Sequence, residues 1–318
     1  MTEPLLSRLA ARGERLTVGA LPWVAPVYRA MPQVAEVIVL PFARGALQLQ
    51  ARRTMARQIK GQFDKAYILP NSLKSALLPA LAGIAQRIGY LGEMRLGLLT
   101  NRLSNPKDKP PMVAFYSALS GEDCLEADRP RLHIADPEIS QALGALGLQR
   151  GAYHVFAPGA EYGPAKRWPA AHFSELAARL ALPVVLLGSD KDAALCDAIA
   201  APVNAVRPGQ CINLAGKTSL EQALCTIAAT KSIVSNDSGL MHVAAAFDVP
   251  QVAIFGSSSP LHTPPLNDKA VVLWLKTDAG YQPPLDCAPC FQRECPLGHT
   301  RCLNDISAER VLQVLSQV

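Results

Sequence analysis

The sequence contains few charged and aromatic residues and no long apolar run. Only 18% of its 318 residues are Asp, Glu, Lys or Arg, and 6% are aromatic. The formal net charge of +5 is modest and is not gathered in a dense Lys/Arg block, which argues against a nucleic-acid partner. Apolar runs such as residues 77–82 are far too short to span a bilayer, and the first residues, MTEPLLSRLAARGE, lack the basic-then-apolar pattern of a signal peptide. We therefore expect a cytoplasmic protein that contacts membranes at most peripherally.

The length and the 49% hydrophobic content predict two globular domains, each with its own core. Strands and helices alternate along the chain, which is typical of a doubly wound parallel sheet. In the first part we expect strands at 16–21, 34–40 and 65–69, and helices at 47–60, 73–84, 112–119 and 138–148. In the second part we expect strands at 153–156, 184–187, 212–214, 233–234, 252–255 and 271–275, and helices at 171–181, 192–200, 220–229, 240–247 and 308–318. A boundary near Arg150-Gly151 gives domains of residues 1–150 and 151–318.

The stretch from Ser232 to Leu266 carries the strongest functional signal. Its pattern predicts a strand, the turn Asn236-Asp237-Ser238-Gly239, a helix, a second strand and a Gly/Ser-rich turn. In such a βαβ unit the helix points its free N–H groups and positive dipole end out of the carboxyl edge of the sheet, where an anion can bind. Gly239 lets an anion approach the backbone, and His242 lies about one turn into the helix. An ordinary Asp/Ser cap with a packed histidine is the alternative.

Residues 157–172, APGAEYGPAKRWPAAH, form a second candidate anion site. They follow a predicted strand and bring Lys166 and Arg167 to the carboxyl edge of the sheet, just before a helix. The stretch lacks the GKS/T ending of a P-loop and the spacing of GxGxxG, so a solvated Lys-Arg pair is the alternative. Gly188-Ser189-Asp190 follows the next strand at the same edge. Because such sheets bind ligands at this edge, the sequence predicts a site for a phosphorylated ligand.

The eight cysteines fall into two groups. Four are scattered and are expected to be small, buried apolar residues in a reducing cytoplasm: Cys124, Cys196, Cys211 and Cys225. The other four form the cluster Cys287-x2-Cys290-x4-Cys295-x6-Cys302, which also contains His299. The spacing matches no standard zinc-finger or ferredoxin pattern. Free thiols or an occasional disulfide are therefore expected, with a structural Zn²⁺ site as the alternative.

Several segments resemble one enzyme family: LPNSLKSALLP, IGYLGEMRLGLL, PGAEYGPAKRWP, SNDSGLMHVAA, FGSSSPLHTPP and CAPCFQRECPLGHTRC. Over nearly the whole chain they resemble the lipopolysaccharide heptosyltransferases of type II, which are inverting glycosyltransferases of family 9. The resemblance implies a glycosyltransferase-B fold, with two Rossmann-like domains facing a cleft. It implies ADP-L-glycero-β-D-manno-heptose as the donor. The acceptor would be the first inner-core heptose on Kdo2-lipid A, reached at the inner face of the inner membrane. Members of this fold generally need no metal, so no cofactor is expected.

The resemblance also assigns roles to individual residues. The donor-binding residues that it implies are Gly159, Lys166, Ser189, Thr218, Asp237, Ser238, Gly239 and His242. Lys166 and the amides of Ser238 and Gly239 would hold the diphosphate. Lys166 and His242 would stabilise the leaving group, and Asp237 would cap and orient the loop. Gly159, Ser189 and Thr218 would line the nucleotide pocket. On the acceptor side the candidates are Asn71, Ser72 and Lys74, for which an ordinary capped helix start is the alternative.

The sequence has no residue that corresponds to the catalytic base of the family. In this family the base is usually an aspartate in the Gly-rich turn after the first strand, and MTEPLL lines up with the stretch that normally follows that turn. We therefore expect an amino-terminal sheet that lacks its first strand, as in a truncated gene model or a defective transferase. Such a chain would bind ADP or ADP-heptose but transfer heptose poorly. Glu161 is interpreted as an exposed loop carboxylate rather than a substitute base. A heptosyltransferase I-type acceptor, an epimerase and a non-transferring nucleotide-sugar binding protein are the alternatives.

Overall fold

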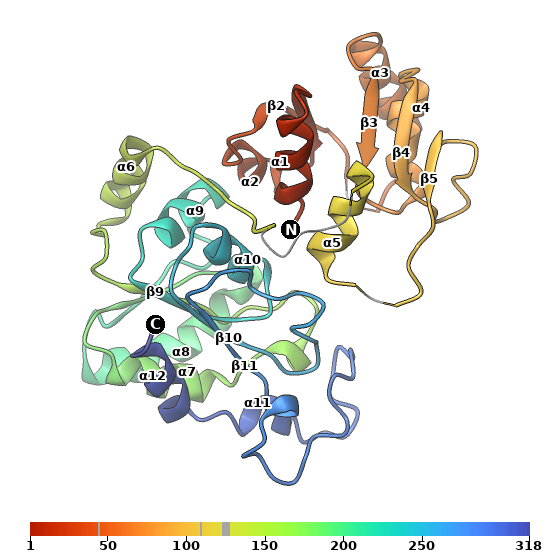
Figure 1. Cartoon of the computed structure of the whole chain (residues 1–318). Helices are drawn as coiled ribbons and strands as arrows, with labels where there is room; N and C mark the ends of the chain where they lie inside the picture. Colours follow the sequence, from red (N-terminus) through yellow and green to blue (C-terminus); the bar gives the residue numbers. More distant parts are fainter. Residues whose placement is uncertain (44, 109, 123–127) are drawn as a thin grey trace. The chain divides into compact units, whose positions relative to one another are not determined.

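The computed structural model describes residues 1–43, 45–108, 110–122 and 128–318, and the chain divides into two compact units (Figure 1). Unit 1 is Met1–Asp128 and unit 2 is Arg129–Val318. Cys124, one of the four scattered cysteines, lies outside the described residues. Both units contain parallel strands with helices between them, so the predicted α/β class is confirmed.

The division lies well before the boundary predicted near Arg150. Helix α6 (Asp136–Leu146), which the sequence pattern assigns to the first domain, belongs to unit 2. It packs against helix α9 (Leu220–Ala228), and the Leu132 amide before it donates to the carbonyl of Ala246 at 2.9 Å. Helix α6 buries its apolar face in unit 2, so the chain enters unit 2 before this helix.

Unit 1 alternates short helices and short strands. Its helices are α1 (Glu3–Ala11), α2 (Ala25–Arg29), α3 (Leu49–Ile59), α4 (Leu73–Leu81) and α5 (Met112–Ser117), followed by the 3-10 turn η1 (Ala118–Ser120). Its strands are β1 (Leu16–Ala20), β2 (Val34–Val39), β3 (Lys65–Ile68), β4 (Gln86–Tyr90) and β5 (Asn101–Leu103). Strands β1, β2 and β3 and helices α3, α4 and α5 agree with the predicted elements. Strands β4 and β5 have no counterpart among them.

The strands of unit 1 form two small parallel sheets, β1-β2 and β3-β4-β5. Helix α1 buries Leu5, Leu6 and Leu9 and contacts β1, α5 and η1. Helix α4 lies against β3 and β4, and α3 lies against α4 (Figure 1). The parallel pairing expected for the amino-terminal domain is thus present within each small sheet.

A buried arginine joins the irregular segments of unit 1. Arg95 is 1% exposed. Its guanidinium donates to the carbonyls of Tyr90 at 2.9 Å and Pro70 at 2.6 Å, and to the side-chain oxygen of Asn71 at 3.2 Å. The fork of five N–H donors of an arginine suits such a set of neutral oxygens. Arg95 therefore fixes the segment between β3 and α4 against the end of β4.

Unit 2 contains a longer run of alternating elements. Its strands are β6 (His154–Ala157), β7 (Val184–Leu186), β8 (Cys211–Asn213), β9 (Ser232–Asn236), β10 (Gln251–Ile254) and β11 (Ala270–Leu273). Besides α6 and α9, its helices are α7 (Ala170–Arg179), α8 (Ala193–Val206), α10 (Gly239–Ala246), α11 (Arg301–Asn304) and α12 (Ala308–Leu315). Short 3-10 turns are η2 (Pro164–Lys166), η3 (Asp190–Asp192) and η4 (Leu275–Thr277). Each predicted strand and helix of this half is present within a few residues; the short α11 was not predicted.

The strands of unit 2 form one six-stranded sheet in the order β11-β10-β9-β6-β7-β8, and every pair is parallel. The chain starts in the middle with β6 and builds outward through β7 and β8. It then returns to the other side of β6 with β9. The sheet therefore reverses its direction of growth between β6 and β9, and open α/β sheets bind ligands at such a switch point.

Both faces of this sheet are covered, as the continuous burial of its central strands requires. In β10, Val252 and Ile254 face the main core, to which α7, α8 and α12 contribute. Their neighbour Ala253 faces the opposite side with Met241 of α10. This alternation is the period of two expected of a strand. The two helical layers cover the faces of the sheet and leave its carboxyl edge to the loops that follow the strands.

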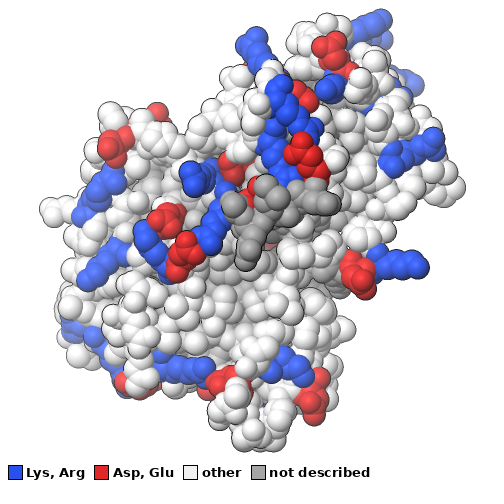
Figure 2. Space-filling model, viewed as in Figure 1, with Lys and Arg blue, Asp and Glu red and all other residues white. Residues whose placement is uncertain are grey.

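Charged residues are distributed over the surface. On the face shown in Figure 2, Lys and Arg side chains are interspersed with Asp and Glu. In unit 2, Arg179 pairs with both Glu175 and Glu309. Exposed pairs of this kind contribute about 0–1 kcal/mol each, so they shape the surface charge more than the stability. Among the described residues, no helix has both the length and the apolarity needed to cross a bilayer.

A buried histidine makes the stability of unit 2 depend on pH. His154 in β6 is 7% exposed, and its Nδ1 lies 2.7 Å from the Ser232 hydroxyl. Burial lowers the pKa of His154 to about 4, and Lys231 acts in the same direction. The unfolded chain keeps the ordinary value of 6.5. Between these two values the unfolded chain binds a proton that the folded chain does not, so the free energy of unfolding falls as the pH drops.

We expect this histidine to lower the free energy of unfolding by up to about 1.4 kcal/mol per pH unit within that window. The His154→Gln variant should lose this part of the pH dependence, because it cannot take up the proton in either state. Urea unfolding followed by tryptophan fluorescence at about pH 7, 6 and 5 measures the difference between the two proteins. Parallel pH curves for the variant and the wild type would contradict the assignment.

Candidate functional site

The loops that follow β6 and β9 meet at the switch point of the unit 2 sheet. The two strands pair in parallel, with Ala157 opposite Ser235. Beyond these residues the chain runs into the loop 158–168 on one strand and into the start of α10 on the other. Both segments therefore leave the sheet side by side at its carboxyl edge.

A buried asparagine joins the two segments. Asn236, the last residue of β9, is 0% exposed. Its Nδ2 donates to the carbonyl of Pro158 at 2.7 Å, and its Oδ1 accepts from the amide of Trp168 at 2.9 Å. One side chain thus holds both ends of the loop 158–168. Removing it would leave two buried backbone groups unpaired, at a cost of about 1–3 kcal/mol each.

The same arrangement brings Lys166 to Asp237. The Nζ of Lys166 lies 2.5 Å from Oδ2 of Asp237, and the two side chains are 20% and 7% exposed. The ammonium lies 5.4 Å from the centre of the Tyr162 ring, and the Thr263 hydroxyl donates to Oδ1 of Asp237 at 3.4 Å. Because both charges are largely removed from water, loss of either partner would leave a costly unpaired charge. The pair fixes a lysine ammonium directly before α10.

Helix α10 begins beside this ion pair. Ser238 is its N-cap residue, and within the described part of the chain no side chain caps the helix. Contrary to the sequence-based prediction, Asp237 does not act as the cap, because its carboxylate pairs with Lys166 instead. A Cβ built on Gly239 would meet nothing within 4 Å, so open space lies beside this residue. The first N–H groups and the dipole of α10 therefore form a site where an anion can bind.

Three further side chains belong to α10, to its N-cap or to the turn after the neighbouring strand β10: His242, Ser238 and Ser258. His242, one turn into the helix, is half-buried. Burial lowers the pKa of His242, and Asp237 opposes this effect. The imidazole is therefore neutral at pH 7 and offers a hydrogen bond rather than a positive charge. The hydroxyls of Ser238 and Ser258 are buried, and among the described residues they have no hydrogen-bond partner. Ser258 is absent from the predicted site, although it lies in the Gly/Ser-rich turn that the sequence shows after β10.

The loops after β6 and β7 are joined by Asp192. Its Oδ2 accepts from the amide and the hydroxyl of Ser189, at 3.0 and 2.8 Å. A Cβ on Gly159 would lie 2.6 Å from Cγ of Asp192, and the Arg167 guanidinium lies 3.9 Å from Oδ1. Gly159 and Ser189, both predicted to line a nucleotide pocket, thus share one neighbour. Asp192 is absent from the predicted site residues, because its contacts with Gly159 and Arg167 depend on the fold.

Thr218 lies in the loop after β8, the outermost strand on that side of the sheet. The loop is tied to its neighbour because the amide of Gly216 donates to the carbonyl of Gly188 at 3.1 Å. The loops after β6, β7, β8 and β9 therefore all lie along one edge of the sheet, and each carries at least one of the predicted donor-site residues.

The predicted acceptor residues lie in unit 1, in the segment between β3 and α4 and in the first turn of α4. Asn71 donates to the side-chain oxygen of Asn105 at 3.2 Å and accepts from Arg95. Ser72 is the N-cap residue of α4, but its side chain forms no capping hydrogen bond among the described residues. The Leu73 amide donates instead to the carboxylate of Glu93 at 2.8 Å. The structure places Lys74 in the first turn of α4, half-buried.

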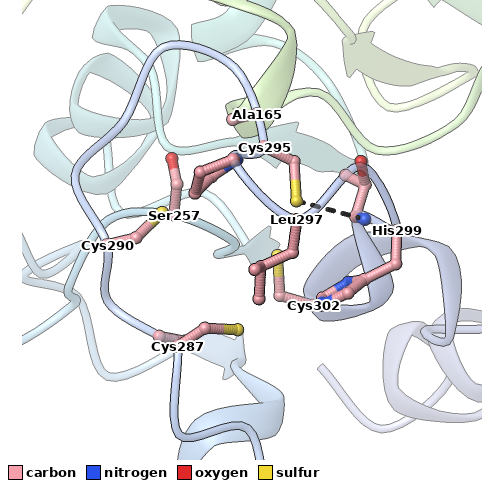
Figure 3. A pocket seen from close by; sticks show the side chains of 11 residues that line it. Ala165, Ser257, Cys287, Cys290, Cys295, Leu297, His299 and Cys302 are labelled. Carbon is pink, nitrogen blue, oxygen red and sulfur yellow. Dashed lines mark hydrogen bonds between the residues drawn. The ribbon is translucent and has the colours of Figure 1, made fainter.

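The Cys-rich segment, residues 285–303, contains a small cavity. Cys287, Cys290, Cys295 and Cys302 are half-buried and, together with His299, line a cavity of about 20 Å³ (Figure 3). The sulfur of Cys295 accepts a hydrogen bond from the Thr300 amide at 3.4 Å. Burial raises the pKa of Cys302 to about 11, and the other three cysteines raise it too. The four thiols are thus close enough to influence one another.

Three of the scattered cysteines are buried in unit 2, as predicted: Cys196, Cys211 and Cys225. Burial raises the pKa of Cys196 to about 12 and that of Cys211 to about 11. Both thiols therefore stay protonated at neutral pH and act as small apolar residues of the core.

Comparison with known proteins places the chain in a family. The family model of glycosyltransferase family 9 (heptosyltransferase) matches residues 52–301. Lipopolysaccharide heptosyltransferase 2 of Escherichia coli K12 is 40% identical over 333 residues, which cover 99% of this chain and 93% of that protein. Its counterpart in Salmonella typhimurium LT2 is 41% identical over 332 residues, with the same coverage. The solved structure of E. coli ADP-heptose LPS heptosyltransferase II gives a TM-score of 0.83 at 39% identity, and the match covers 99% of this chain and 93% of that one.

These similarities extend through both units and confirm the expected glycosyltransferase-B type of fold, with two Rossmann-like domains. The match to the family model includes the loop of Lys166 and the start of α10, where the structure has already brought a cation and free helix amides together. The chain belongs to glycosyltransferase family 9, the heptosyltransferases, and is a glycosyltransferase.

Proposed function

We propose that the protein transfers L-glycero-D-manno-heptose from ADP-heptose to the first heptose of the lipopolysaccharide inner core, with inversion. The observation that carries this proposal is the Lys166 ammonium held before the open start of α10. The similarity to heptosyltransferases 2 over 99% of the chain supports the type II acceptor. The acceptor would be Kdo2-lipid A that already carries one heptose, presented at the inner surface of the inner membrane.

The donor diphosphate would rest on three groups. An ammonium has three N–H donors, and Asp237 takes one from Lys166. The others are available to a phosphate oxygen. The amides of Ser238 and Gly239 lie at the start of α10, where the helix dipole favours negative charge. The open space beside Gly239 lets a phosphate approach the backbone.

The same groups would assist the chemistry. As the bond between heptose and phosphate breaks, negative charge builds up on the leaving ADP. Donors that are fixed in advance stabilise this charge without reorganising, which lowers the barrier to the transition state. Asn236 and Asp237 hold the loop and the lysine in place before the donor arrives. The neutral imidazole of His242 would add a hydrogen bond on the same side.

The remaining residues would select the substrates. Gly159, Ser189 and Thr218 follow β6, β7 and β8, and we propose that they line the site of the nucleoside. Asn71 and Ser72, which precede α4, and Lys74 in its first turn are proposed to contact the acceptor. A lysine suits that task because the inner core carries anionic groups, and its charge would attract them over several ångströms.

Replacing Lys166 by Ala should weaken ADP binding by about tenfold to a hundredfold, since hydrogen bonds to charged groups contribute about 1.5–3 kcal/mol. Part of the loss would come from Asp237, whose carboxylate would then repel the diphosphate. The double variant Lys166→Ala/Asp237→Asn removes this repulsion, and the loss that remains in it measures the direct contact. Titration calorimetry with ADP gives each dissociation constant.

Lys231→Ala is the matched control for these variants. Lys231 is an exposed lysine that directly precedes β9, at the opposite end of the same strand. Its removal changes the net charge by the same amount and should leave ADP binding unchanged. Wild-type affinity in the double variant at low salt would exclude a contact between Lys166 and the diphosphate.

The acceptor is tested with two substrates of defined length. We expect a mass increase of one heptose on Kdo2-lipid A that carries a single heptose, and none on Kdo2-lipid A without heptose. Mass spectrometry of the lipid detects this product directly, even at a low rate of transfer. Modification of the heptose-free acceptor alone would assign a type I acceptor, and loss of ADP-heptose in the absence of any lipid would indicate a reaction other than transfer.

A further inference from the structure

The Cys-rich segment brings a second positive charge to the loop that carries Lys166. The ring of Tyr162 belongs to this loop and is 44% exposed. The Lys166 ammonium lies 5.4 Å from the centre of the ring, and the guanidinium carbon of Arg293 lies 5.6 Å from the same centre. Cations within about 6 Å of an aromatic ring are attracted by its negative face. Two cations from distant parts of the sequence therefore share one ring.

The backbone around Arg293 is fixed against the same loop. The Ala165 amide donates to the carbonyl of Arg293 at 3.1 Å, and the Tyr162 hydroxyl donates to the carbonyl of Phe291 at 2.7 Å. The Phe291 amide donates to the carbonyl of Ser257, in the turn after β10, at 2.7 Å. Ala165 and Ser257 also line the cavity of the Cys-rich segment (Figure 3). The guanidinium therefore extends from a backbone position that the loop holds in place.

The proposed donor site needs more positive charge than Lys166 supplies. The charge of Lys166 is balanced by that of Asp237. The start of a helix contributes only about half a positive charge, whereas a terminal phosphate alone carries about 1.5–2 negative charges at pH 7. A further cation beside Lys166 would therefore stabilise a bound diphosphate.

Arg167 lies in the same loop, but its guanidinium is already in use. It donates to the carbonyl of Ala160 at 3.3 Å and lies 3.9 Å from a carboxylate oxygen of Asp192. Arg293, by contrast, is exposed, and no carboxylate in the part of the chain that the structure describes forms an ion pair with it. Its N–H donors are therefore available to phosphate oxygens, which match the fork of a guanidinium.

We propose that Arg293 binds the terminal phosphate of the nucleoside diphosphate, the phosphate that carries the sugar in the donor. The inference rests on the proposed donor site, and the order of the strands assigns the phosphate. Ser189 and Thr218, proposed to line the nucleoside site, follow β7 and β8 on one side of β6. The Cys-rich segment is bonded to the turn after β10, on the other side. With the diphosphate held at β6 and β9, its terminal phosphate would face β10 and therefore Arg293.

The experiment compares ADP with AMP, which lacks the terminal phosphate. In the full chain, Arg293→Gln should raise the dissociation constant of ADP by about tenfold, the effect of removing one charged hydrogen-bond partner. It should leave the dissociation constant of AMP unchanged. Titration calorimetry measures ADP, and displacement of ADP measures AMP. The ADP affinity of the variant should also fall less steeply with salt, because one cation fewer contributes. Equal weakening of ADP and AMP, or unchanged ADP affinity, would overturn the proposal.

Arg293→Lys separates charge from packing and gives a reading that does not depend on AMP. It keeps the positive charge without the planar fork, so it should regain most of the ADP affinity that Arg293→Gln loses. A loss as large as that of Arg293→Gln would overturn the role of the charge.

Arg150→Gln is the matched control. Arg150 precedes β6, at the opposite end of this strand from the loop of Lys166, and forms an exposed pair with Asp136. Its replacement changes the net charge by the same amount and should leave the binding of both nucleotides unchanged. A loss of ADP affinity equal to that of Arg293→Gln would assign the effect to net charge and overturn the contact.

The wild type tests the proposed function separately. If it binds ADP and transfers heptose while Arg293→Gln binds ADP equally well, the contact of Arg293 is refuted and the proposed function stands. If the wild type does not bind ADP, the proposed donor site is refuted, and the role of Arg293 with it.

Discussion

The proposed donor site depends on the buried side chain of Asn236. The parallel register of β6 and β9 brings the two loops out of the sheet together, but a register alone does not fix a flexible loop. Asn236 does so by bonding to the backbone at both ends of the loop 158–168. Lys166 is thereby held within reach of Asp237. Because Asp237 is used in this pair, the helix start after it keeps its amides for a ligand.

The sequence predicts the elements of unit 2 more completely than those of unit 1. Strands such as β9 and β10 are buried on both faces and appear as short apolar runs between turns. In unit 1, β4 has the sequence QRIGY and β5 is the three-residue strand NRL. Neither shows an apolar run or a clear alternation. They are strands because β4 pairs in parallel with β3, and β5 pairs in parallel with β4. This is a tertiary effect that the local pattern cannot reveal.

The sequence predicts the sheet edge at which the candidate site lies, but it does not predict the contacts between the residues of the site. Alternating strands and helices place every loop that carries a predicted residue at one end of a parallel sheet. They do not say that β9 lies next to β6, and the pairing of Lys166 with Asp237, 71 residues apart, depends on that order. The capping role predicted for Asp237 was wrong for the same reason, because its carboxylate pairs with Lys166 from a neighbouring loop. Arg95 was missed because its partners Pro70 and Asn71 lie about 25 residues away and only the fold brings them near. The hydrogen bonds of Asp192 to Ser189 are local, and only the fold shows that its carboxylate also lies against Gly159.

The loop that carries Lys166 also packs against the Cys-rich segment. Here the loop is restrained by direct contact between two backbones rather than by a side chain. A Cβ on Gly163 would lie 2.4 Å from the carbonyl oxygen of Arg293, so the two backbones touch and only glycine fits. The segment is anchored by the buried side chains of Leu285 and Leu303 near its ends. Between them lie irregular residues, each of which costs about 1–2 kcal/mol of conformational entropy to order. The close approach at Gly163 and the backbone hydrogen bonds from Ala165 to Arg293 and from Phe291 to Ser257 restrict this stretch where no strand ladder does, and they fix the residue that directly precedes Lys166.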